Sequence, residues 1–515
     1  MSAFVAEQHK EARPSLLSNS RWNLIGFAFG LAANFVTLPF VVKWIGLSAF
    51  GQVGVLLAIT GPLTLVGSVI GQALVREMSS RWGVSDRDGA RRIHDAALRL
   101  CLIVGVAGWA ALVLIGPSIA LLILGSGSPS AGLRASFMIA AAGWLAQQLC
   151  LVLQGGCAAR QDFRAVARVA AFSGVATVAA TLTMTAVFPT VDGYLAGVAA
   201  SFALTLAAWL WVQRGDIRWQ AVARAELRAE SLALLHFSKW QGMAQLAGAF
   251  GNQIDRYALG ALAPVAVVGQ YNVANRLQEA AYIGVVKAGE VLFPHFGSLA
   301  NRSIEERGRV FQAASWVVGT FSAMLLVPMV PLASSLLTLW MGPQVGADTA
   351  ALLRTLVLGG IVGCGSNVFV YYAMGMGRNA PVAWISLMYS VATVVFTVLL
   401  IRGFGPLAAG AGLLVASLGR VAASLVVTRR QFFPQLRWGE LMVSLVLPLA
   451  IGVTVALGVH QSGYAQAHSW ASLVAQYACV AALVLVVTVL VSLLTRSGRE
   501  FIATTRAALR PHSTT

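Results

Sequence analysis

Residues 98–124 read LRLCLIVGVAGWAALVLIGPSIALLIL, an apolar run that follows a basic segment and ends at a short loop. A helix of about 20 apolar residues crosses the roughly 30 Å hydrocarbon core of a bilayer. Runs of this kind recur along the chain at 22–44, 49–75, 98–124, 134–154, 166–188, 192–213, 237–262, 267–293, 309–331, 347–373, 380–402, 404–428, 440–460 and 470–494. The sequence therefore predicts an all-α polytopic membrane protein with about 14 spans.

The basic residues predict how these spans are oriented. Of the 36 Lys and Arg residues, 29 lie in the two tails and in every second loop, including the stretch from Arg420 to Arg437. The intervening loops hold almost none. Cytoplasmic loops carry such an excess of positive charge, so both termini are predicted to lie in the cytoplasm.

Composition argues against several other classes of protein. The chain is 58% hydrophobic and 11% charged, which is outside the range of soluble domains. Its net charge of +17 is spread over many loops, which does not favour nucleic-acid binding. The sequence contains no CxxC, no HExxH and no phosphate-binding GxxxxGK[ST] loop, so we predict no metal and no cofactor.

The polar segment 214–235 divides the spans into two groups of six. We expect an N-lobe, a cytoplasmic linker, a C-lobe and two additional spans between two cytoplasmic tails. Their predicted limits are 1–20 for the first tail, 21–213 for the N-lobe, 214–235 for the linker, 236–430 for the C-lobe, 431–495 for spans 13 and 14, and 496–515 for the last tail.

The two halves resemble each other in sequence. Gly51-Gln52 and Gly269-Gln270 each begin a span and are 218 residues apart, as are Asn34 and Asn252, and Arg160 and Arg378. The run VATV at 175–178 returns at 391–394. Because each half has an even number of spans, the repeat is predicted to be parallel, with the lobes related by an axis along the membrane normal.

Polar and charged residues are concentrated in spans 7 and 8, where each charge costs several kcal/mol unless it faces protein or water. At 100° per residue, five residues of span 8 lie within about 80° and six of span 7 within about 100°. Those of span 8 are Asn272, Arg276, Glu279, Lys287 and Glu290. Those of span 7 are Ser238, Gln241, Gln245, Asn252, Asp255 and Arg256. Span 1 adds Asn23, Asn34 and Thr37. Three polar faces predict an aqueous cavity between the lobes.

A purely structural interpretation of these charges stays open. Arg276 with Glu279, and Lys287 with Glu290, are spaced i, i+3 and would neutralise each other on one helix. Asp255 would equally lock spans 7 and 8 together by pairing with Arg276.

The sequence resembles a known family of transporters at residues 255–277. DRYALG (255–260) and VGQYNVANRL (268–277) are similar to the signature of polysaccharide transporters, and IGLSAFG (45–51) fits the opening of that family. The resemblance is to the O-antigen flippase-like branch of the multidrug/oligosaccharidyl-lipid/polysaccharide (MOP) superfamily. It implies a MATE-like fold of two six-helix lobes around a central cavity, with spans 13 and 14 as an addition.

The resemblance also implies a function. Such proteins move an undecaprenyl-diphosphate-linked oligosaccharide across the bacterial inner membrane during assembly of O-antigen, exopolysaccharide or capsule. We expect Arg256, Arg276 and Lys287 to attract the diphosphate. We expect amides to bind sugar hydroxyls; these are Asn34, Gln245, Asn252 and Asn272. Asp255, Glu279 and Glu290 are expected either to couple transport to H⁺ or Na⁺ or to pair structurally.

Other functions remain open at this point. A multidrug cation antiporter of the same superfamily would prefer acidic and aromatic residues in its cavity. A membrane-embedded glycan-assembly enzyme needs catalytic groups on substantial external loops, and the longest external loop here, near 125–133, has no carboxylate. The expected partners are the lipid-linked substrate, a coupling ion and a polysaccharide polymerase or assembly complex.

Overall fold

The computed structural model describes residues 16–83, 86–124, 131–160, 162–215, 230–232, 234, 254–289, 292–299, 302–343, 345–463, 466–495 and 498–500. At several positions within these ranges, among them Asn34 and Asp255, it describes the backbone only. The chain forms two compact units. The first comprises Met1–Gly46 and Leu56–Leu246, and the second comprises Leu47–Val55 and Ala247–Thr515.

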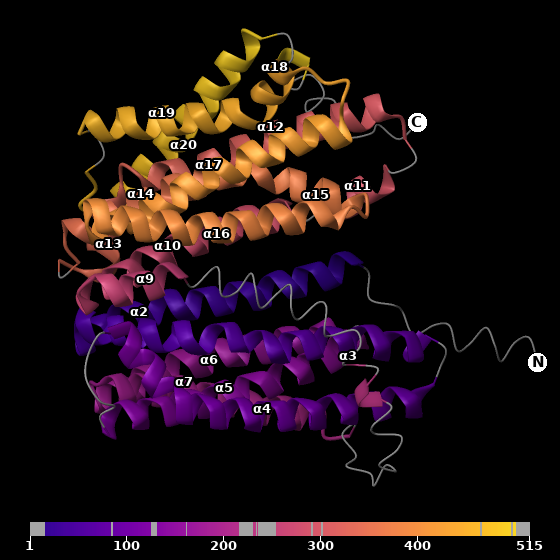
Figure 1. Cartoon of the computed structure of the whole chain (residues 1–515), viewed down its shortest axis with the longest axis vertical. Coiled ribbons are helices and arrows are strands. Elements are labelled where there is room, and N and C mark those ends of the chain that lie inside the picture. The colour runs from indigo at the N-terminus through magenta and orange to yellow at the C-terminus, as the bar shows by residue number, and fades with distance from the viewer. Residues whose placement is uncertain are drawn as a thin grey trace, which may run out of the picture. The chain divides into compact units, whose positions relative to one another are not determined.

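The described part of the chain is helical throughout, which confirms the all-α prediction (Figure 1). The first half holds α2 (Leu16–Thr60), η1 (Gly61–Thr64), α3 (Leu65–Gly83), α4 (Arg87–Leu124), α5 (Ala131–Ala159), α6 (Phe163–Val187) and α7 (Val191–Val212). The second half begins with α9 (Ile254–Leu262), α10 (Val265–Gly289), α11 (Leu292–Ser298), α12 (Ile304–Leu326), η2 (Val327–Met329) and α13 (Ala333–Met341). It continues through α14 (Ala347–Gly363), η3 (Cys364–Ser366), α15 (Asn367–Gly375), α16 (Asn379–Phe404), η4 (Pro406–Ala408), α17 (Ala409–Val427), η5 (Thr428–Phe432), α18 (Trp438–Leu441), η6 (Met442–Val446), α19 (Leu447–Gln461) and α20 (Trp470–Leu493).

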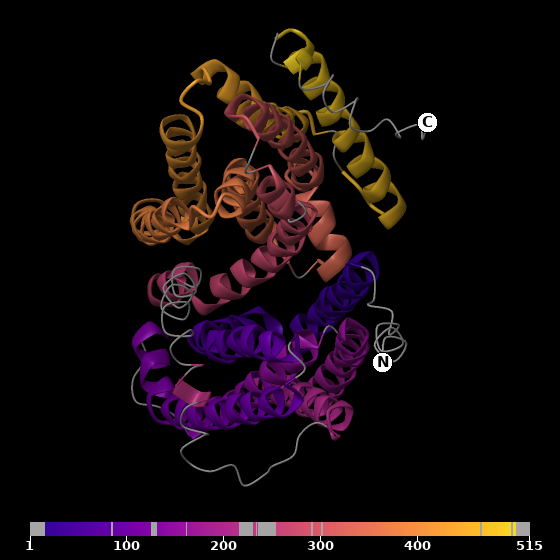
Figure 2. The same cartoon turned by 90° about the vertical axis from the view of Figure 1, so that its right-hand side faces the viewer.

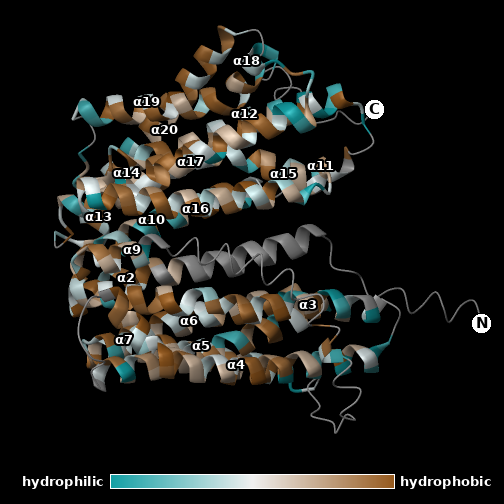
Figure 3. Cartoon of the chain, in the orientation of Figure 1, coloured by the Kyte–Doolittle hydropathy of each residue, from teal (hydrophilic) through white to brown (hydrophobic). Residues whose placement is uncertain are grey.

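Eleven stretches of the described chain are long and apolar enough to cross a membrane. The predicted break between the first two spans falls inside α2, at Gly46, whose φ of 83° is one that glycine adopts without strain. The short helix α13 lies where the sequence predicts only a loop. Figure 3 shows hydrophilic residues gathered toward the ends of long apolar helices such as α3 and α4.

In the first unit, small residues let α3 and α5 pack closely. A Cβ atom on Gly67 would lie 2.9 Å from the Gln148 carbonyl oxygen, and one on Gly71 would lie 2.9 Å from that of Leu151. Glycines four residues apart lie on one helix face and permit such an approach of two backbones. The Gly67-x-x-x-Gly71 pattern therefore serves packing within this unit.

In the second unit, the additional helices α19 and α20 pack against α12 (Figure 2). The indole nitrogen of Trp316 on α12 donates a hydrogen bond of 2.9 Å to the Ser492 hydroxyl on α20. A cluster of buried aromatic rings, made by Phe296, Phe311, Tyr372, Phe432 and Phe433, joins α11, α12, α15 and the end of α17. The two C-terminal helices are thus part of the second unit's packing.

One helix pair in each unit shows the same close crossing. In the first unit, a Cβ atom on Gly197 of α7 would lie 2.6 Å from the Thr181 Cα of α6. In the second, a Cβ atom on Gly412 of α17 would lie 2.6 Å from the Thr397 Cα of α16. These threonines are 216 residues apart and the glycines 215, which is the spacing of the repeated VATV run. The sequence repeat is therefore also a repeat of helix packing.

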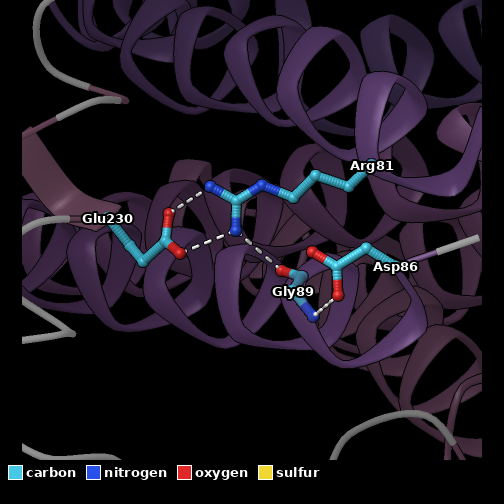
Figure 4. Close-up of polar contacts among 4 residues, drawn as sticks. All are labelled: Arg81, Asp86, Gly89 and Glu230. Atoms are coloured by element: carbon cyan, nitrogen blue, oxygen red, sulfur yellow. Dashed lines mark hydrogen bonds and ion pairs between the residues drawn. The ribbon is translucent and has the colours of Figure 1, made fainter. Parts of the chain in front are cut away.

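The end of the polar linker is attached to the first unit by an ion pair (Figure 4). Arg81, near the end of α3, donates two hydrogen bonds of 2.6 Å to the Glu230 carboxylate and one of 3.0 Å to the Gly89 carbonyl. Donating to Glu230 raises the pKa of the Arg81 guanidinium, which keeps its charge. Leu234 is fully buried in the core cluster of the first unit. This part of the linker is fixed on the first unit.

Candidate functional site

The site is built on α10, which packs against residues 47–55 of α2 within the second unit. A Cβ atom on Gly51 would collide with the Val265 carbonyl oxygen, and one on Gly269 would collide with that of Leu47. Leu47 and Val265 are also 218 residues apart. The two glycines that reveal the sequence repeat therefore lie against each other in a symmetric contact between backbones.

The same face of α10 carries Asn272, three residues after Gly269. Asn272 is 5% exposed, and a Cβ atom on Gly54 would overlap its side-chain amide. Its Nδ2 atom has no hydrogen-bond partner among the described residues. Asn272, expected to face the cavity, is thus covered by α2 in this structure.

Farther along this face, the cover by α2 ends. Arg276 and Lys287 are both exposed, although each lies within 25 continuous helical residues. Arg276 is one helical turn from Asn272 and about 40° around the axis. The two predicted cations of α10 are therefore accessible in the second unit, whereas the amide before them is not.

Between the two cations, α10 is linked to α9 by an ion pair. Arg256 is 8% exposed, and its Nη2 atom lies 3.6 Å from Oε1 of Glu279. The Asn275 amide donates a hydrogen bond of 2.8 Å to the same oxygen. The Glu279 side chain remains 45% exposed. Glu279 thus pairs with Arg256 rather than only with its i−3 neighbour, and it retains an accessible carboxylate edge.

The remaining predicted site residues lie outside the described side chains. Gln245, Asn252 and Glu290 fall in segments the structure does not describe, and Asn34 and Asp255 are described in backbone only. Their predicted roles, and the predicted pairing of Asp255 with Arg276, stay predictions.

The loop-based charge count placed one further cation incorrectly. Arg420 was assigned with its basic neighbours to a cytoplasmic loop, but it lies within α17, inside the apolar stretch Pro406–Phe432. Its guanidinium lies over the Tyr389 ring of α16, 5.1 Å from the ring centroid. The signal that identifies it is its distance of several residues from the next basic residue, Arg429.

The polarity of α10 sets it apart from the neighbouring helices. It has 25 residues, enough to cross a bilayer, yet it is not among the eleven stretches apolar enough to do so by composition. A helix of this kind is not stable with its charged face against lipid, so that face must contact protein or water. The stripe of Asn272, Arg276, Glu279 and Lys287 is the candidate site.

Several solved structures share this fold. A lipid II flippase MurJ in an inward closed conformation aligns with a TM-score of 0.69 at 11% identity, over 92% of this chain and 98% of that chain. An inward-facing multidrug resistance MATE family transporter of the MOP superfamily aligns with a TM-score of 0.67 at 13% identity, over 79% and 98%. A MOP superfamily transporter from Pyrococcus furiosus, whose binding pocket is described as having reverse polarity, has a TM-score of 0.56 at 16% identity, over 80% and 94%. No curated protein matches the chain in sequence.

A multi-pass, all-helical chain of two units with this likeness has the transporter fold of the MOP superfamily. The family model described as "polysaccharide biosynthesis protein" matches residues 16–300, more than half of the 515 residues. The chain belongs to that family of the superfamily and is a membrane transporter rather than an enzyme.

Proposed function

We propose that this transporter moves an undecaprenyl-diphosphate-linked oligosaccharide from the cytoplasmic to the periplasmic leaflet of the bacterial inner membrane. The observation that carries the proposal is α10, a helix of spanning length whose charged stripe leaves Arg276 and Lys287 exposed. The cargo has a diphosphate and a glycan that do not cross hydrocarbon, while its polyprenyl tail stays within it. Exposed cations on a spanning helix supply the charge that such a headgroup requires.

The roles of the side chains follow from their chemistry. Arg276 offers a planar fork for two phosphate oxygens, and Lys287 offers a point charge. Amides such as Asn272 donate to and accept from sugar hydroxyls. In the described geometry Asn272 is covered by Gly54, so we expect it to reach the cargo only after α2 and α10 separate. Movement of the two lobes against each other would then expose the cargo to either side of the membrane in turn.

The orientation follows from the charge asymmetry of the loops, with both termini in the cytoplasm. We expect the surface polysaccharide to be O-antigen, exopolysaccharide or capsule, and a polymerase or assembly complex to accept the product. Direction requires a free-energy source. We assign it to an H⁺ or Na⁺ gradient acting through Asp255, Glu279 or Glu290, or to consumption of the product outside.

The test is transport by the purified protein in vesicles. A fluorescent undecaprenyl-diphosphate oligosaccharide is supplied on one leaflet, and its exposure on the other is followed with a membrane-impermeant quencher. We expect Arg276→Ala and Lys287→Ala each to slow protein-dependent exposure by about tenfold or more, because each removes a charge-assisted contact. Arg309→Ala, which removes an exposed arginine of α12, is the matched control and should transport normally.

The outcomes separate the alternatives. Normal transport by both α10 variants would leave these cations as structural charges and overturn the assignment. Export of a cationic dye, with no movement of several lipid-linked glycans, would indicate a multidrug antiporter instead. For coupling, Asp255→Asn should transport at a rate that no longer responds to a proton or sodium gradient, whereas loss of folded protein would mark Asp255 as structural.

A further inference from the structure

Arg420 is a cation inside the second unit that the proposed cargo site does not use. It lies in the middle of α17, eleven residues after Ala409 and seven before Val427, and is partly buried. A charged side chain at such a depth faces protein or water, because exposure to lipid costs several kcal/mol. Its position over Tyr389 shows that it faces α16 within the unit.

The groups around Arg420 are mostly hydrogen-bond donors. The Tyr282 hydroxyl on α10 donates to Oδ1 of Asn367 on α15 at 3.1 Å, and Arg420 and Tyr389 lie near enough to act electrostatically on that hydroxyl. Asn367 is 6% exposed, and its Nδ2 atom has no hydrogen-bond partner among the described residues. Because Oδ1 is occupied by Tyr282, this buried amide presents two unused N–H donors.

Arg420 has no acidic partner among the residues the structure describes, since no carboxylate there lies within ion-pair distance of it. Contact with an aromatic face compensates a cation only in part. An arginine fork and a free amide, with no neutralising carboxylate, form an environment that lacks one component. That component is an anion that accepts hydrogen bonds at more than one atom.

The first unit contains the same position without this chemistry. Counting from the shared crossing of Thr181 with Gly197 and of Thr397 with Gly412, Tyr389 corresponds to Ser173 and Arg420 to Thr205. Thr205 donates a hydrogen bond of 2.9 Å to the Ser173 hydroxyl. A neutral hydroxyl pair therefore satisfies the geometry of this helix pair. The crossing itself does not require a cation.

We propose that Arg420, with Asn367 and Tyr282, forms an oxyanion-binding site within the second unit, distinct from the α10 cations, for a phosphate or diphosphate group. Two sources share this chemistry, a free inorganic anion and the headgroup of a lipid-linked diphosphate. The site does not depend on the proposed cargo being correct, because binding of the group is measured without transport.

The experiment measures calorimetric binding to the full-length protein in maltoside micelles, which contain no phosphate. Inorganic diphosphate and farnesyl diphosphate are the two probes. All measurements use the Arg276→Ala/Lys287→Ala background, so that the α10 cations do not contribute. Into it are introduced Arg420→Thr/Tyr389→Ser, which transfers the first unit's pair, and Arg402→Thr, which removes an exposed cation at the end of the neighbouring α16.

We expect the background protein and the Arg402→Thr protein to bind diphosphate alike, and the transferred pair to weaken binding by about tenfold or more. Asn367→Asp is the second variant. It is nearly isosteric, gives Arg420 an internal carboxylate and should abolish binding while the protein stays folded. Binding of both probes identifies the free oxyanion as sufficient, and binding of the farnesyl probe alone identifies the lipid headgroup.

Three results would overturn the proposal. The background protein would bind neither probe, or the transferred pair would bind as tightly as the background, or Arg402→Thr would weaken binding as much as the transferred pair. None of these results bears on transport in vesicles, so the two proposals fail independently.

Discussion

The helix pair α6–α7 of the first unit and the pair α16–α17 of the second have the same backbone crossing and different chemistry. In each, a glycine on the second helix meets a buried threonine on the first, with the same 2.6 Å between the Cα of that threonine and an added Cβ. Two turns farther along α7 and α17, the first pair has Thr205 against Ser173, and the second has Arg420 against Tyr389.

This difference shows which residues hold the helices together and which are free to take another role. Close packing of two membrane helices depends on small residues where the backbones approach, because lipid is as apolar as the side chains. The crossing has therefore kept glycine in both units. The position two turns away tolerates either a neutral hydroxyl pair or a cation over an aromatic ring.

The largest effect expected on the comparison comes from Gly197→Ala and Gly412→Ala. Each adds a Cβ atom 2.6 Å from a backbone carbon, so the helices must separate, at a cost of about 1–3 kcal/mol. Thermal unfolding of the purified proteins should show similar losses for the two. Gly419→Ala is the control, because a Cβ there has no atom within 4 Å. A large loss for only one of the two crossing glycines would show that the crossings are not equivalent.

A smaller effect is expected from Thr205→Val in the first unit. It removes the hydrogen bond to Ser173 at nearly constant volume, and hydrogen bonds between membrane helices average about 0.6 kcal/mol. Vesicle transport should be unchanged while the thermal midpoint falls slightly. If Thr205→Val instead reduced transport, the first unit's pair would not be the purely structural counterpart of Arg420 and Tyr389.

The smallest effect is expected from Thr181→Val and Thr397→Val. Both hydroxyls are buried without a hydrogen-bond partner among the described residues. Replacing such a hydroxyl by a methyl group removes an unsatisfied polar atom, so we expect unchanged stability or a gain of up to about 1 kcal/mol in each unit. A marked loss in one unit alone would indicate that its hydroxyl binds a group, such as a water molecule, that the other lacks.

The long apolar runs and the break at Gly46 were predictable from the sequence, because span length and glycine conformation are local properties. The helix face shared by Asn272 and Arg276 was also predictable from their spacing. Their different exposure was not, since Asn272 is covered by Gly54, more than 200 residues away in the chain. The position of Arg420 was missed because counting charges by loop assigns a residue near a span end to the wrong environment.

The contact of Gly51 with Gly269 joins equivalent positions of a repeated sequence and is therefore self-complementary. Symmetric homodimers form such isologous contacts, in which one residue supplies both sides of the interface. Had the halves been two copies of one shorter polypeptide, a single glycine codon would have created this close approach twice over. In the joined chain that economy is lost, and each of the two glycines is now a separate target on which a substitution can fall.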